Sequence, residues 1–170
     1  VIDRVDYSED WHNEVIDFKD GTALERVAFN APSNSPDNWQ SAATICYGTP
    51  SYANSQTAQP GFSDQTFTIT PPSFSPDDDG NDDFTLISYQ LSDPGYVVNI
   101  TIYDERGREV RRLVQNEILG TQGFYKWNGN TDGAEKASLG IYVVYIELFN
   151  LKGDVQKIKK TCVVGGRLNE

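Results

Sequence analysis

The sequence predicts an all-β fold, in which an antiparallel β-sandwich follows a partial second β module. Three observations support this prediction. Short segments of alternating apolar and polar residues recur after residue 66, turn-forming residues separate them about every 8 to 12 residues, and no segment has the pattern of an amphipathic helix of about three turns. We count about seven strands from Phe67 onward, and enzyme folds that need a βαβ unit or a phosphate loop are poorly supported.

The clearest strands lie in the second half of the chain. Between 96 and 103 apolar and polar residues alternate, as in a half-buried strand. The longest apolar run, 141–149, fits a central strand with both faces covered better than a helix. Lysines alternate with apolar residues in 155–164, so we expect a wet face near a sheet edge. Shorter strands are predicted at 109–114 and 124–127.

The N-terminal third holds too few strands for an independent sheet. Its strand-like segments are 1–7 and 22–29, joined by a polar, turn-prone stretch. Two short strands are not stable alone in water. Either residues further upstream complete the sheet, or this piece leans on the second region or on another copy of itself.

A stretch rich in Ser, Gly, Pro, Asn and Gln, 49–64, separates the two regions. We place the boundary near Ala58. The predicted organisation is a partial β domain at 1–58, a linker at 59–66 and a β-sandwich at 67–170. The chain contains no Met and opens inside an alternating segment, so we interpret it as a piece of a longer polypeptide.

Composition narrows the function classes. The chain of 170 residues has 14 Lys and Arg against 25 Asp and Glu, a formal charge of −11, which argues against binding nucleic acid by charge. No apolar run approaches the roughly 20 residues that span a bilayer, and the N-terminus lacks the layout of a signal peptide. Aromatic residues make up 12% of the chain, enough to supply a core, so disorder is not expected.

The most unusual segment is 77–83, which packs five Asp and one Asn around Gly80. Carboxylates this dense repel one another, and a bound Ca²⁺ relieves the repulsion because it takes six to eight oxygen ligands. The segment does not fit the EF-hand pattern, since Leu86 stands where that loop needs a bidentate Glu. The other interpretation is a solvated acidic turn whose Asx side chains bond the local backbone.

Other reactive groups are few. Cys46 and Cys162 fall one in each region, and we expect two unbonded thiols, with Cys162 on an apolar face. His12, the single histidine, has no sequence-adjacent nucleophile or orienting group, so we interpret it as a surface or packing residue. The three Trp and nine Tyr residues could form a sugar-stacking platform, but in a small sandwich aromatic residues are usually core and rim.

Residues 1–55 resemble the last half of a bacterial lamin-tail-like domain, an Ig-like sandwich of secreted and surface proteins. The resemblance lies in the segments "GTALERV" and "NWQSAATICYGTPSYANS". Such domains commonly pair a Ser-Leu-Glu-Arg strand with an Asn-Trp-His-Ser-Ala segment and a Thr-Pro-Gly-x-x-Asn close. Gln40 and Ser51 depart from that pattern, and the first strands of such a domain are absent from this chain.

The chain from Phe67 onward resembles the Ig-like C-terminal domains related to the flagellar hook-cap type, which Bacteroidetes exoproteins often carry. The segments that carry the resemblance are "FSPDDDGNDDF", "VNITIYDERGREVRRL", "WNGNTDG" and "LGIYVVYIELFNLKG". Some relatives are sorting signals for the type IX secretion machinery, and others are adhesive or spacer modules. The resemblance implies export, a non-catalytic role and a Ca²⁺ loop whose ligands map onto Asp77, Asp79, Asn81 and Asp83.

These observations predict two Ig-like β modules, the first incomplete, in a secreted or surface-exposed protein. The expected role is a structural, adhesion or secretion-sorting segment. Its expected partners are the upstream domains of its parent and the secretion machinery or a surface partner, with no nucleic acid. One alternative is an accessory carbohydrate-binding module of a secreted hydrolase, which requires two or more Trp side chains in one exposed flat patch. A second is an enzyme, which requires a pocket with convergent titratable groups.

Overall fold

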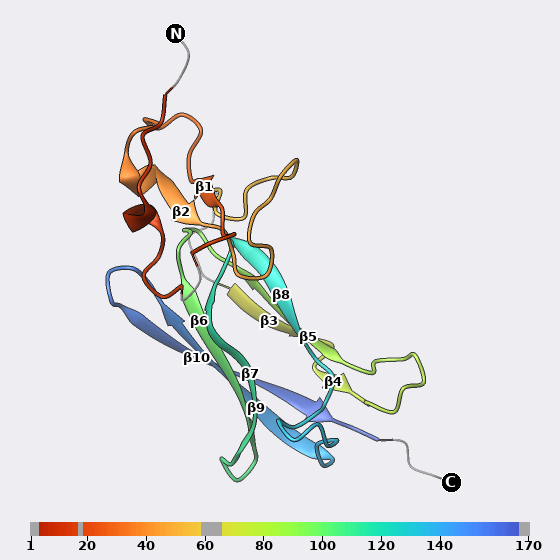
Figure 1. The fold of residues 1–170 in the computed structure, drawn as a ribbon. Helices are drawn as coiled ribbons and strands as arrows, with labels where there is room; N and C mark the ends of the chain where they lie inside the picture. The colour runs from red at the N-terminus through yellow and green to blue at the C-terminus, as the bar shows by residue number, and fades with distance from the viewer. Residues whose placement is uncertain (1–3, 17–18, 59–65, 167–170) are drawn as a thin grey trace.

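Two β-sheets pack through their apolar faces in the computed structural model, which describes residues 4–16, 19–58 and 66–166 (Figure 1). The larger sheet has the strand order β4 (Ser73–Phe74), β10 (Val155–Val164), β9 (Gly140–Phe149), β6 (Val97–Asp104) and β7 (Glu109–Ile118). The smaller sheet has the order β3 (Thr66–Thr70), β5 (Thr85–Gln90) and β8 (Gln122–Trp127). The predicted all-β sandwich is therefore confirmed.

All neighbouring strands of the two sheets run antiparallel except β4 and β10, which are parallel. The chain leaves the smaller sheet after β3, passes the cis peptide bond between Thr70 and Pro71, and enters the larger sheet as β4. The segment 66–74 thus contributes one edge strand to each sheet, β3 to the smaller and β4 to the larger. Strand β4 is only two residues long, and the sequence prediction missed it.

Strand β9 lies between β10 and β6, as predicted for a central strand. The prediction that both its faces are covered is wrong. Val144, Ile146 and Leu148 are fully buried, but on the opposite face Ile141 is 55% exposed. The outer face of the larger sheet has no second layer over it in the described part of the chain, so only the inward residues of β9 join the core.

The core is centred on Trp127, at the end of β8. Its fully buried ring makes edge contacts with Phe74 of β4 and Tyr142 of β9, at centroid distances of 5.3 and 5.2 Å. These contacts join the smaller sheet to the larger one. Burial of each large apolar side chain contributes roughly 1.5–3 kcal/mol, so this aromatic cluster is a major part of the packing between the sheets.

The N-terminal part forms a two-stranded antiparallel sheet, β1 (Leu24–Arg26) with β2 (Trp39–Ser41), and two 3₁₀ helices, η1 (Glu9–Trp11) and η2 (Pro36–Asn38). The strand predicted at 1–7 is wrong for its described residues, 4–7, which pair with no strand. The backbone N–H of Asp6 there donates to the Asn34 side chain instead. The strand predicted at 22–29 shrinks to three residues.

Side chains of the N-terminal part end the short sheet early. The amide side chain of Asn38 accepts from the N–H of Ala28 and donates to the carbonyl of Ala28. These bonds satisfy the backbone that would otherwise continue a strand ladder. The sequence left open what supports the N-terminal part. In the structure it packs against the sandwich.

The contact between the two parts is built on Gln56, which is fully buried. Its Nε2 donates to the carbonyl of Leu119, and its Oε1 accepts from the N–H of Gly95. The N–H of Thr121 donates to the carbonyl of Ser55, which lies so close to Gly120 that a Cβ there would stand 2.9 Å from it. Residues 55–56 therefore seal one end of the sandwich.

A buried carboxylate holds residues 55–56 to β1. Glu25, 4% exposed, accepts from the hydroxyls of Thr49 and Ser55 and from the N–H of Gln56. Three donors satisfy the buried charge, as a buried charge requires. The predicted linker lies at 59–66; residues 59–65 are outside the described residues, and Thr66 already belongs to β3.

Replacing Gln56 by Leu should destabilise the whole chain, because it leaves the carbonyl of Leu119 and the N–H of Gly95 buried without a partner. Each such group costs about 1–3 kcal/mol. Urea unfolding followed by tryptophan fluorescence measures the change. The matched control is Gln122→Leu on the exposed surface of β8, which should leave the midpoint nearly unchanged. Equal midpoints for the two variants would show that Gln56 does not hold the parts together.

Candidate functional site

Three loops lie at the end of the sandwich away from Gln56, and we call them the loop end (Figure 1). They are the acidic loop 75–84 between β4 and β5, the hairpin turn 104–109 between β6 and β7, and the connection 128–139 between β8 and β9. Contacts between side chains of one loop and another bring together residues far apart in the sequence.

The acidic loop is folded by bonds within itself. The N–H of Ser75 donates to the carbonyl of Asp82 and closes the loop. The Asp83 carboxylate accepts from the N–H groups of Asp79 and Gly80, at 3.1 and 2.8 Å. Gly80 has a φ of +91°, a conformation that glycine adopts without strain. The Asp79 carboxylate, which accepts from the N–H two residues further on, forms an Asx turn within the same loop.

This turn brings three of the predicted ligands together. One carboxylate oxygen from each of Asp77, Asp79 and Asp83 lies within 4.8 Å of the other two. The fourth predicted residue, Asn81, lines a shallow hollow together with Asp77 and Asp79, and its backbone N–H donates to the Asp79 carboxylate. Three oxygens at this spacing can hold a metal ion, although exposed acidic groups commonly lie close without one.

Lys136, from the connection 128–139, contacts the acidic loop. Its Nζ lies 3.0 Å from Oδ2 of Asp78 and also donates to the carbonyl of Pro76. Asp78 therefore points away from the triad, and one lysine partly neutralises the loop. The sequence prediction missed Lys136, because no pattern relates residues 58 positions apart.

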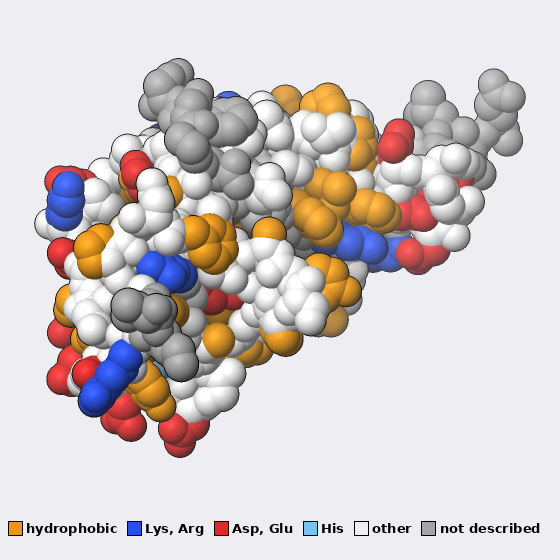
Figure 2. Space-filling model, turned by 90° about the horizontal axis from the view of Figure 1, so that it is seen from above, with side chains coloured by type: hydrophobic (Ala, Val, Ile, Leu, Met, Phe, Trp, Pro, Cys, Tyr) orange, Lys and Arg blue, Asp and Glu red, His pale blue; other side chains and the backbone are white. Residues whose placement is uncertain are grey.

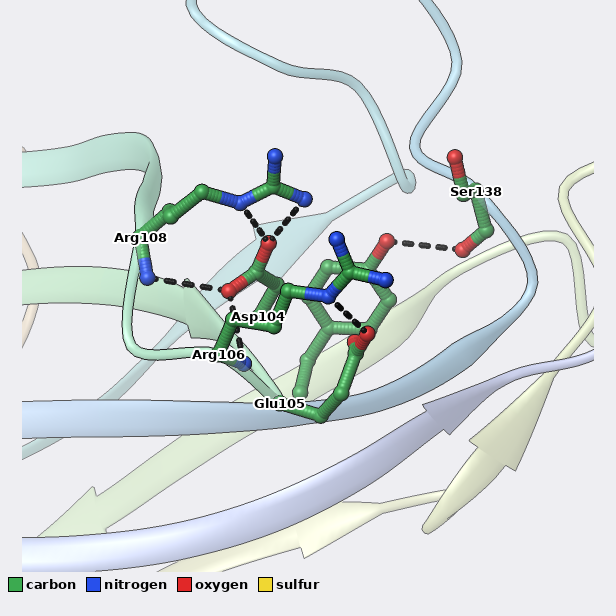
Figure 3. A network of polar contacts seen from close by, with 6 residues as sticks. Asp104, Glu105, Arg106, Arg108 and Ser138 are labelled. Carbon is green, nitrogen blue, oxygen red and sulfur yellow. Dashed lines mark hydrogen bonds and ion pairs between the residues drawn. The ribbon is translucent and has the colours of Figure 1, made fainter.

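The hairpin turn is built around Asp104, whose side chain is 8% exposed (Figure 3). Its carboxylate accepts from the backbone N–H groups of Arg106 and Arg108 and from the Arg108 guanidinium, at 2.7–2.9 Å. The Arg108 N–H, followed by the guanidinium and the Arg106 N–H, holds the pKa of Asp104 below its ordinary value, against the opposing effect of burial.

A hollow lies between this turn and the connection 128–139. Its lining includes Arg108, Glu135 and Tyr142. The Tyr142 hydroxyl donates to the carbonyl of Ser138 at 2.7 Å, and burial raises the pKa of that hydroxyl. In its lining Asp104 is paired with Arg108, and Lys136 is paired with Asp78 of the acidic loop. Acidic side chains at both ends of the molecule lie beside basic ones in the view from above (Figure 2).

The remaining candidate residues have structural positions. His12 is half-buried, its Nδ1 lies 3.0 Å from the Ser41 hydroxyl, and burial lowers its pKa. Cys46 and Cys162 are free thiols, as expected, and burial raises the pKa of Cys162 to about 12. No helix in the described residues is long and apolar enough to cross a membrane.

Comparison with known families identifies the sandwich. A family model described as the CHU_C type IX secretion signal domain matches residues 68–164, more than half of the chain. The chain belongs to this family. The match spans the two packed sheets from β3 to the end of β10 and includes all three loops of the loop end.

Two solved structures similar to the chain are remote from it. One is PorZ, described as an essential bacterial surface component of the type IX secretion system of Porphyromonas gingivalis, with 19% identity and a TM-score of 0.35 over 58% of this chain. The chain spans 11% of the length of PorZ. Another is CopC from Methylosinus trichosporium OB3b, with 16% identity and a TM-score of 0.33 over 52% of this chain and 80% of CopC. No curated protein matches. With scores this low, neither structure is a guide to function.

Membership in the CHU_C family confirms the coarse sequence interpretation. The domain is a type IX secretion signal, a non-catalytic role, and the protein that carries it is exported to the outer cell surface or the medium. The family match includes no residue of 1–58, so the resemblance of that part to a lamin-tail-like domain has no support from the comparisons.

Replacing Asp104 by Asn should lower stability at neutral pH, and the loss should shrink in acid. A carboxylate with a depressed folded pKa stabilises the fold above its unfolded pKa, and this contribution disappears as the pH falls through the lower folded value. Urea midpoints of the wild type and Asp104→Asn should therefore converge below pH 3.8, the ordinary value. Glu135→Gln, on the exposed rim, is the control. A gap between wild type and Asp104→Asn that is independent of pH would contradict this role.

Proposed function

We propose that the sandwich at 66–166 is the sorting segment of a longer exported protein and carries upstream domains to the type IX machinery. The observation behind this proposal is the coincidence of the family match, 68–164, with the two packed sheets. The segment that the family model matches is therefore a folded module.

The carbohydrate-binding alternative has less support. It requires at least two Trp side chains in one exposed flat patch. Trp127 is fully buried in the core. Trp11 and Trp39 are half-buried and tilted by 31° relative to each other, with centroids 6.5 Å apart. This tilted pair packs η1 against β2, a structural role for both rings.

The sorting proposal predicts that the whole chain, fused to the C-terminus of a reporter enzyme bearing an inner-membrane export signal, sends the reporter to the surface or medium. The test uses a bacterium with a type IX system and a strain that lacks it. Reporter activity should appear outside only in the first strain. Ile146→Asp, which buries a charge in the core, should keep the reporter inside. Equal export from both strains would refute the proposal.

We also propose that the acidic loop binds Ca²⁺ through Asp77, Asp79, Asn81 and Asp83. The support is the meeting of three carboxylate oxygens within 4.8 Å, on a turn shaped by Gly80. Oxygen ligands from one short loop suit a hard cation. Bound Ca²⁺ would replace carboxylate repulsion with attraction and fix the loop beside the end of β10.

After chelator treatment, millimolar Ca²⁺ should raise the melting temperature of the chain, since a ligand at a hundred times its Kd stabilises the native state by about 2.7 kcal/mol. Asp79→Ala should abolish the rise. Asp93→Ala removes an exposed carboxylate outside the triad and should leave the rise intact. Scanning calorimetry makes the measurement. A wild type that melts at the same temperature with and without Ca²⁺ would remove the metal assignment and leave the sorting function untouched.

A further inference from the structure

Strand β10 has an open edge over most of its length. It pairs with β9 along ten residues without a register shift, but on its other side β4 pairs only with Val163 and Val164. In the described part of the chain, no strand is hydrogen-bonded to 155–161 on that side. Such an edge presents backbone donors and acceptors in the spacing that another strand needs.

The direction of the free backbone groups follows from β4. The N–H of Val163 donates to the carbonyl of Pro72, outward from β9. Backbone groups of an antiparallel strand point to alternate sides with a period of two residues. The N–H and C=O groups of Val155, Lys157, Lys159 and Thr161 therefore face the open side. β4 itself shows that a strand fits against this edge.

The side chains along the edge are basic, on a chain whose formal charge is −11. Lys157, Lys159 and Lys160 are exposed. Lys157 lies 3.8 Å from Glu147, and Lys159 lies 6.0 Å from the ring centre of Tyr145. Lysines on an edge oppose pairing with a second copy of the same edge, because like charges would face each other.

The two sides of the edge differ. Lys157 and Lys159 share the outer face of the sheet with Glu147 and Tyr145, their partners on β9. On the other side lie Ile158, which is half-buried and packs against the core, and the exposed Lys160. A strand placed along this edge would set alternate residues beside the lysines and beside Ile158. The matching sequence alternates acidic with apolar residues.

The edges at β7 and β3 fit less well. The outer side of β7 is occupied by Asp132, whose carboxylate accepts from the N–H of Arg112 and whose N–H donates to the carbonyl of Val110. The pairing of β7 with β6 is also interrupted by register shifts. Strand β3 is only five residues long.

We propose that the open edge of β10, residues 155–161, binds an extended acidic segment of a partner protein as an added strand. Main-chain hydrogen bonds to Val155, Lys157, Lys159 and Thr161 supply affinity, and the lysines select carboxylates. This inference goes beyond the sorting function, and its test does not depend on secretion.

The test uses three synthetic eight-residue peptides and the whole chain at physiological salt. One peptide alternates Glu with Val and Thr, one has Lys in place of Glu, and one is the Glu peptide with N-methylated backbone. Fluorescence anisotropy measures binding. The Glu peptide should bind at least about tenfold more tightly than either analogue, which corresponds to about 1.4 kcal/mol. Equal affinities of the three peptides would overturn the proposal.

Variants at Thr161 and at the lysines distinguish the contribution of backbone hydrogen bonds to binding from that of the lysine charges. Thr161→Pro removes one outward N–H and keeps every lysine, and Thr161→Val is its matched control. Binding of the Glu peptide should fall about tenfold in the first variant and persist in the second. The double variant Lys157→Glu with Lys159→Glu should prefer the Lys peptide. Binding that survives Thr161→Pro in folded protein would overturn the added strand.

Two readouts remain decisive if Thr161→Pro fails to fold. NMR shifts of the wild type on adding the Glu peptide should concentrate on the amides of 155–161, and shifts centred on β7 or the loop end would overturn the assignment. Sedimentation of the wild type without peptide should show a monomer. A dimer dissociated by the Lys157→Glu and Lys159→Glu double variant would assign the edge to a second copy and overturn the proposed partner.

Discussion

The fold depends on covering the inner face of the larger sheet. Four of its five strands are long, and their inward residues can leave water only if the smaller sheet lies over them. Trp127 is central to this cover, because its ring reaches across to Phe74 and Tyr142. Its Nε1 donates to the carbonyl of Asn130, so the residue that joins the sheets also fixes the start of the connection that carries Lys136. Core and loop end are thus positioned together.

Sequence periodicity predicted the long strands well and the N-terminal part poorly. The strand at 155–164 has the predicted bounds because it pairs with β9 along its whole length, and Ile158, Cys162 and Val164 turn to the core as the alternation indicates. Residues 4–7 also alternate, yet form no strand, since alternation does not supply a partner. Gln56 was not anticipated, because a buried amide satisfied by residues 95 and 119 leaves no local pattern.

The candidate metal site was predictable in part because its ligands are neighbours in the sequence. Asp77, Asp79 and Asp83 meet through bonds within seven residues, and this local density is visible in the sequence. The contact of Lys136 with Asp78 arises only when the two sheets pack. Local chemistry therefore indicated the ligands, while tertiary structure decided which carboxylate is diverted to a lysine.

The parallel pairing of β4 with β10 has a mechanical consequence. The chain enters β4 from the N-terminal side and leaves β10 toward the C-terminus, so tension applied between the two ends pulls these strands in opposite directions along their length. Bonds such as that from Gly165 to Phe74 then bear the load in shear and break together, instead of peeling one after another. A passenger protein that pulls on this module meets resistance where β4 pairs with β10.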